Sequence, residues 1–104
     1  MRAFLFVVAL LGVPAQDADE QYTYVAALAE KGLHDRVVRE AREFLRANPN
    51  HAKADLARYR LACALFELGR LAEARPEFAE LAKRAGFEFS AEVQFRLAQC
   101  LLDG

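Results

Sequence analysis

Apolar residues recur every three or four positions through most of this chain, which is the pattern of amphipathic helices. Leu61, Ala62 and Leu65 form one apolar stripe of a helix that ends at Gly69, because glycine readily adopts the left-handed conformation that follows a helix. A second helix follows and is closed by Gly86. Its apolar stripe consists of Leu71, Ala74, Phe78, Leu81 and Ala85.

The preceding part of the chain shows the same arrangement. Gly32 marks a turn, and the second helix after it has the apolar positions Val37, Ala41, Phe44 and Leu45. Asn48-Pro49-Asn50 ends this helix, because Pro49 disfavours helical geometry at the residue before it. No alternating β pattern occurs after residue 16. Pro76 conflicts with the pattern, and we expect a late helix start or a mild kink there.

The sequence repeats itself with a period of 36 or 37 residues. The segment 59–65 (YRLACAL) aligns with 95–101 (FRLAQCL), and Tyr22, Leu28 and Gly32 precede Tyr59, Leu65 and Gly69 by 37 positions. The repeat predicts an all-α fold, an α-solenoid of about two and a half helix-turn-helix hairpins. Its units are residues 18–54, 55–90 and the first helix 91–104. Ala62, Ala74 and Ala98 are expected where two helices approach closely.

The first fifteen residues have the pattern of a secretory signal peptide. Arg2 supplies a basic start, residues 3–13 form an apolar run, and Val13-Pro14-Ala15 offers small residues for cleavage after Ala15. The run is shorter than the roughly 17–25 apolar residues that span a bilayer. We therefore predict a signal peptide over 1–15, a mature repeat domain over 16–104, no membrane span, and a periplasmic or secreted location.

The composition of the chain argues against several classes of function. The chain has 104 residues, 14 Lys and Arg, and 15 Asp and Glu, so it lacks the basic excess of a nucleic-acid binder. His34 and His51 follow turn residues, have no metal-ligand spacing and are expected to be solvent-exposed loop residues. Cys63 has no base near it in the sequence. We predict no catalytic residue, no metal site and no cofactor. Cys63 and Cys100 are expected to remain free thiols, because packed helices hold backbones farther apart than a disulfide spans.

The repeat resembles the tetratricopeptide repeat family. The resemblance rests on Leu61, Ala62, Leu65, Gly69, Ala74 and Phe78 in unit two, on Leu28, Gly32 and Pro49 in unit one, and on Leu97, Ala98 and Leu101 in unit three. The usual tryptophan is absent, and an aromatic residue takes the fifth position instead, at Tyr22, Tyr59 and Phe95. Together with the leader, this is similar to bacterial envelope members such as the periplasmic protein of the Tol–Pal complex and the outer-membrane-assembly lipoprotein.

The resemblance implies a concave groove lined by the first helix of each unit. Its expected partner-binding residues are Tyr22, Ala26, Tyr59, Cys63, Phe66, Phe95 and Gln99. The three aromatic residues among them either form an exposed rail along the groove or pack as core between adjacent helices, and both interpretations stay open.

The predicted function is therefore that of an exported, non-catalytic scaffold that binds a protein or peptide partner. The alternative is an N-terminal repeat fragment of a larger envelope or secretion protein, whose activity lies beyond residue 104. The last predicted helix, with Leu97, Leu101 and Leu102, has no second helix to cover it. Self-association through this uncovered C-terminal helix is therefore a further prediction.

Overall fold

The computed structural model of the protein describes the backbone of residues 15–103 and the side chains of residues 17–103. The predicted signal peptide lies outside the described residues, apart from Ala15, where the first described helix begins. In the described part every regular element is a helix: α2 (Ala15–Glu30), α3 (His34–Ala47), α4 (Ala54–Glu67), α5 (Leu71–Ala82) and α6 (Ser90–Asp103). The predicted all-α class is confirmed for this part of the chain.

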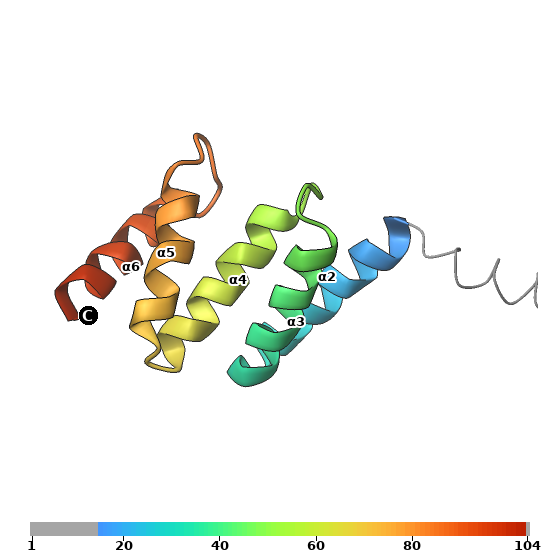
Figure 1. The fold of residues 1–104 in the computed structure, drawn as a ribbon, viewed down its shortest axis with the longest axis horizontal. Helices are drawn as coiled ribbons and strands as arrows, with labels where there is room; N and C mark the ends of the chain where they lie inside the picture. Colours follow the sequence, from blue (N-terminus) through green and yellow to red (C-terminus); the bar gives the residue numbers. More distant parts are fainter. Residues whose placement is uncertain (1–14, 104) are drawn as a thin grey trace, which may run out of the picture.

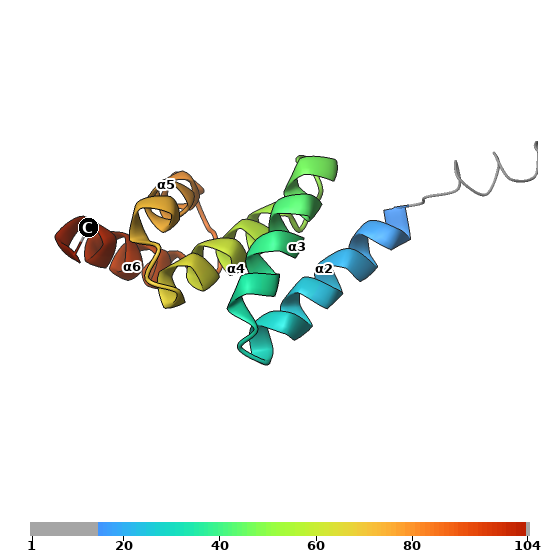
Figure 2. The same ribbon diagram turned by 60° about the horizontal axis from the view of Figure 1, so that its bottom comes forward.

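The helices follow one another along an elongated molecule of 61 × 28 × 20 Å. Figure 1 shows α2, α4 and α6 inclined in the same direction, with α3 and α5 in front of them. Figure 2 shows the same order from α2 to α6 along the long axis. Each helix packs against the next one in sequence, and α2 also packs against α4.

The turns α2–α3 and α4–α5 have the same backbone geometry, 37 residues apart. Gly32 and Gly69 have φ values of 73° and 77°, in the left-handed region where the sequence predicted glycine. The next residues, Leu33 and Arg70, have nearly identical angles, with φ of −86° and −87° and ψ of 68° and 66°. Their N–H groups donate to Leu28 and Leu65 at 3.1 and 2.9 Å. Both hairpins are thus closed by one turn type.

Two clusters of apolar side chains hold the helices together. In the larger one, Leu61, Ala62 and Leu65 of α4 pack with Ala74, Phe78 and Leu81 of α5, and all six are nearly or fully buried. In the smaller one, Tyr22 of α2 packs with Phe44 and Ala57, and its ring lies 6.2 Å from the Phe44 ring. The period of three and four in the sequence therefore corresponds to buried faces.

Charged pairs cross between helices outside these clusters. Arg42 of α3 donates to Glu73 of α5 at 3.0 Å, Arg58 of α4 donates to Glu77 of α5 at 2.6 Å, and Arg84 donates to Asp55 at 3.2 Å. Because these side chains are partly exposed, each pair contributes little to stability.

Of the two expectations at Pro76, a late helix start or a mild kink, the late start is wrong. α5 begins at Leu71 and contains Pro76 as its sixth residue. The missing proline N–H leaves the carbonyl of Ala72 without its helical donor, but Ala72 and Pro76 are both exposed, so water can reach that carbonyl.

The expectation for Ala98 is also wrong, while Ala62 and Ala74 are fully buried as predicted. Ala98 is exposed because no described helix packs over that side of α6. In the described part, no helix is both long enough and apolar enough to cross a membrane.

Candidate functional site

A cavity of about 170 Å³ lies where the end of α2, the start of α3 and the middle of α4 meet. We call it the inner cavity. Its lining residues are Ala29, His34, Val37, Tyr59, Arg60, Cys63, Ala64 and Glu67. The lining mixes apolar residues with a few polar groups, which is the usual character of a binding pocket.

The local fold explains how these residues come together. The five α4 residues are spaced by one and three positions, so they share one face of that helix. The left-handed Gly32 turns the chain sharply after α2, so that α3 starts at His34, beside that face. Ala29 leaves space between α2 and α4, because it has no side chain beyond Cβ.

Aromatic side chains from the α5–α6 loop cover one edge of the inner cavity at Tyr59. The Phe89 ring stacks on the Tyr59 ring at a centroid distance of 4.7 Å and an interplanar angle of 7°. Phe87 meets both rings edge-on at 5.9 Å. Tyr59 is therefore half-buried, and burial raises the pKa of its hydroxyl, as do the neighbouring Cys63 and Glu92.

Cys63 is a free thiol without the surroundings of a nucleophile. Burial raises its pKa, although Tyr59 and the Arg96 guanidinium act in the opposite direction. His34 lines the same cavity, but within residues 17–103 no hydrogen bond joins it to the Cys63 thiol. Since the thiolate is the reactive form, the geometry gives no support to cysteine chemistry.

Arg96 of α6 connects α4 and α6 beside Cys63. It donates to Glu92 at 2.6 Å and to Glu67 at 3.3 Å, and its guanidinium lies 4.8 Å from the centre of the Phe66 ring. These contacts combine ion pairing with a cation–π interaction. They place a partly exposed group of charges next to the inner cavity.

The structure divides the seven residues that the sequence placed in one groove among different surroundings. Tyr59 and Cys63 line the inner cavity, whereas Tyr22 and Ala26 belong to the cluster around Phe44. Phe66 is half-buried and meets the Phe78 ring edge-on at 6.3 Å. Phe95 is 60% exposed, and Gln99 is partly exposed on the same helix. Of the two interpretations of the aromatic residues, core packing therefore applies to Tyr22, whereas Phe95 is exposed to solvent.

Sequence reasoning missed several residues of this region. His34 was expected in an exposed loop, but it is the first residue of α3 and is half-buried. His51 was also expected to be exposed, but its ring meets Phe44 edge-on at 5.4 Å and its Nδ1 accepts the Lys53 N–H at 3.0 Å. Phe87 and Phe89 follow His51 and Lys53 by 36 positions. This offset, equal to the repeat period, was the available sign in the sequence that these loop residues pack against the helices.

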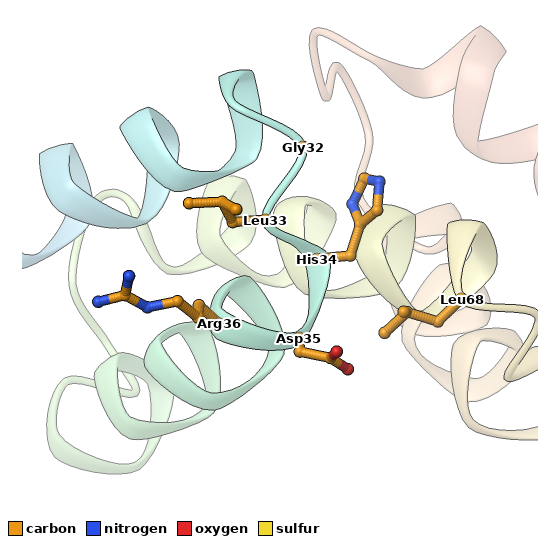
Figure 3. Close-up of a pocket in the computed structure, with 6 residues that line it drawn as sticks. All are labelled: Gly32, Leu33, His34, Asp35, Arg36 and Leu68. Atoms are coloured by element: carbon orange, nitrogen blue, oxygen red, sulfur yellow. The ribbon is translucent and has the colours of Figure 1, made fainter.

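A second hollow lies at the α2–α3 turn and has a volume of about 310 Å³. Figure 3 shows its lining residues: Leu33 and Arg36 point to one side, His34 and Asp35 to another, and Leu68 at the end of α4 points toward Asp35. Their polar groups do not converge on one point, so this hollow lacks the arrangement of a catalytic site. Among residues 17–103, no group of three or more His, Cys, Asp or Glu side chains could hold a metal ion.

Comparisons with known proteins yielded no match for this chain. No family model, no curated protein and no solved structure is significantly similar to it.

Proposed function

We propose that this protein is a non-catalytic helical-repeat scaffold, of the tetratricopeptide kind, which binds a protein or peptide partner on its inner face. The single observation that carries the proposal is the inner cavity between two hairpins that share the same turn geometry 37 residues apart. Stacked hairpins form extended surfaces for partners, and the cavity provides a pocket on such a surface.

The size and lining of the inner cavity indicate the chemistry of the partner. The cavity, of about 170 Å³, is large enough for an apolar side chain of the partner. Arg60 and Glu67 lie on the same face of α4, at opposite ends of the α4 lining, so a partner can place polar groups of either charge beside its apolar anchor. Because a pocket of this kind holds one anchor residue, an extended peptide is the simplest partner.

We further propose that the protein acts outside the cytoplasm, in the bacterial cell envelope. Support comes from the leader pattern of residues 1–15 and from the envelope resemblance of the repeat. The raised pKa of Cys63 fits a pocket that binds rather than reacts.

A cavity-filling substitution tests the inner face. Ala29→Met should place a longer side chain into the inner cavity, and capture of the partner from an envelope extract should fall about tenfold or more, because the anchor loses its pocket. Ala27→Met is the matched control, since Ala27 lies on the exposed side of the same helix. Equal capture by both variants, with unchanged circular dichroism, would exclude the inner cavity as the binding site.

A further inference from the structure

Helix α6 carries an apolar stripe that no described residue covers. Leu102 is 84% exposed, Leu101 and Phe95 are each 60% exposed, and Ala98 between them is also exposed. These four residues, which we call the α6 stripe, follow helical spacing and lie along one side of the helix. No charged residue interrupts them from Phe95 to Leu102 except Arg96, whose guanidinium turns toward α4.

The same structure shows what covers such a stripe. Ala62 and Leu65 precede Ala98 and Leu101 by 36 positions, and both are fully buried in the cluster with Ala74, Phe78 and Leu81 of α5. Phe66, which precedes Leu102 by 36 positions, contacts the Phe78 ring. The cover over α4 is therefore an amphipathic helix with apolar residues at positions i, i+4 and i+7. α3 has the same spacing at Val37, Ala41 and Phe44, all of them buried.

A hollow and an unpaired charge border the α6 stripe. A cavity of about 70 Å³ is lined by Leu71, Ala72 and Arg75 of α5 and by Cys100 of α6. Arg75 is exposed and forms no ion pair within residues 17–103. A helix that covers the stripe would meet this guanidinium, so an acidic residue on its near edge would be favoured.

We propose that the α6 stripe is a docking site for an amphipathic helix of another polypeptide, one that crosses α6 as α5 crosses α4. This helix carries apolar anchors at i, i+4 and i+7, with at least one large residue among them, and acidic residues on its polar side facing Arg75. Helix-in-groove binding is a general mode of recognition that uses this spacing of anchors. The docking site is separate from the inner cavity.

The helix that covers α4 supplies the probe. A fluorescent peptide with the sequence of α5, residues 71–82, is titrated with the full chain; it contains Ala74, Phe78 and Leu81 and has three glutamates against one arginine. We expect saturable binding by fluorescence anisotropy. Leu101→Asp in the protein, or Phe78→Ala in the peptide, should weaken binding about tenfold or more, because each removes an apolar side chain that the complex would bury. Arg75→Glu should weaken binding at low salt.

Two control variants and a measurement of folding complete the test. Leu33→Asp replaces an exposed leucine far from α6 and should leave peptide binding unchanged, as should Ala29→Met at the inner cavity. Circular dichroism verifies that the Leu101→Asp protein is folded. Absence of binding, or equal binding by Leu101→Asp and Leu33→Asp, would overturn the proposal. A dimer of the chain alone in sedimentation, dissociated by Leu101→Asp, would assign the stripe to a second copy and overturn it as well.

Discussion

The Glu73 carboxylate links the α2–α3 hairpin to the α4–α5 hairpin through an ion pair with Arg42. It accepts two hydrogen bonds from Arg70 at 2.8 Å and one from Arg42 of α3 at 3.0 Å. The hydrogen bonds from Arg70 and then Arg42 lower the pKa of this carboxyl from 4.5 to about 2. A carboxyl with a lowered pKa stabilises the folded state above its unfolded pKa, and this contribution disappears as the pH falls through the folded value.

The contribution of Glu73 to the free energy of unfolding should therefore change with pH between about 4.5 and 2. Compared with Glu73→Gln, the wild-type protein should have the larger free energy of unfolding above about pH 4.5, and the difference should vanish as the pH falls toward 2. Urea denaturation from pH 2 to 7 measures it. Glu88→Gln is the control, because Glu88 is exposed and has no ion pair in the described part. A difference that does not change with pH would contradict this account of Glu73.

At the scale of elements, the second helix of each hairpin decides which alanines are buried. Ala62 and Ala98 occupy corresponding positions of α4 and α6, 36 residues apart. Ala62 lies under α5 and is fully buried, whereas no described helix lies over Ala98. The two helices thus have similar sequences in different surroundings.

This difference predicts responses of different size to the same substitution. Ala62→Leu should lower the free energy of unfolding by about 1–3 kcal/mol, because the added carbons have no space between α4 and α5. Ala98→Leu should change it by less than about 0.5 kcal/mol, as is usual for exposed sites. Thermal or urea denaturation of both variants measures the contrast. Equal destabilisation would show that something also covers α6.

At the scale of the whole molecule, the central helix α4 should be the most stable against local unfolding. α4 packs against α2, α3 and α5, and its residues Ala57, Leu61, Ala62, Ala64 and Leu65 are nearly or fully buried. α6 packs mainly against α5 and buries only Val93 and Cys100. In a molecule in which helices contact their neighbours along one axis, the terminal elements open more easily than the central one.

Hydrogen exchange can measure this gradient. The amides of α4 should exchange most slowly, and those of α6 should exchange considerably faster, because α6 contributes only Val93 and Cys100 as buried residues to the cluster that contains Phe78. Addition of the residue 71–82 peptide should slow exchange in α6. Equal protection of α4 and α6 in the free chain would contradict the gradient.

Local sequence was sufficient to predict the elements. The spacing of Leu61, Ala62 and Leu65, and of Ala74, Phe78 and Leu81, identified the helices and their buried faces. Gly32, Gly69 and Gly86 identified the turns, and all three have positive φ. These features could be predicted because helix periodicity and left-handed geometry depend on residues that are close in the chain.

Only the tertiary structure decided which surfaces are free. Tyr22, Tyr59 and Phe95 occupy equivalent positions, yet Tyr22 packs on Phe44, Tyr59 lies under Phe89, and Phe95 is exposed. The inner cavity likewise needs Ala29, His34 and Tyr59 from three helices. The sequence by itself determined the helices, the turns and the faces they bury. Exposure and the cavity were decided by the tertiary structure, because they depend on which distant side chains lie against each position.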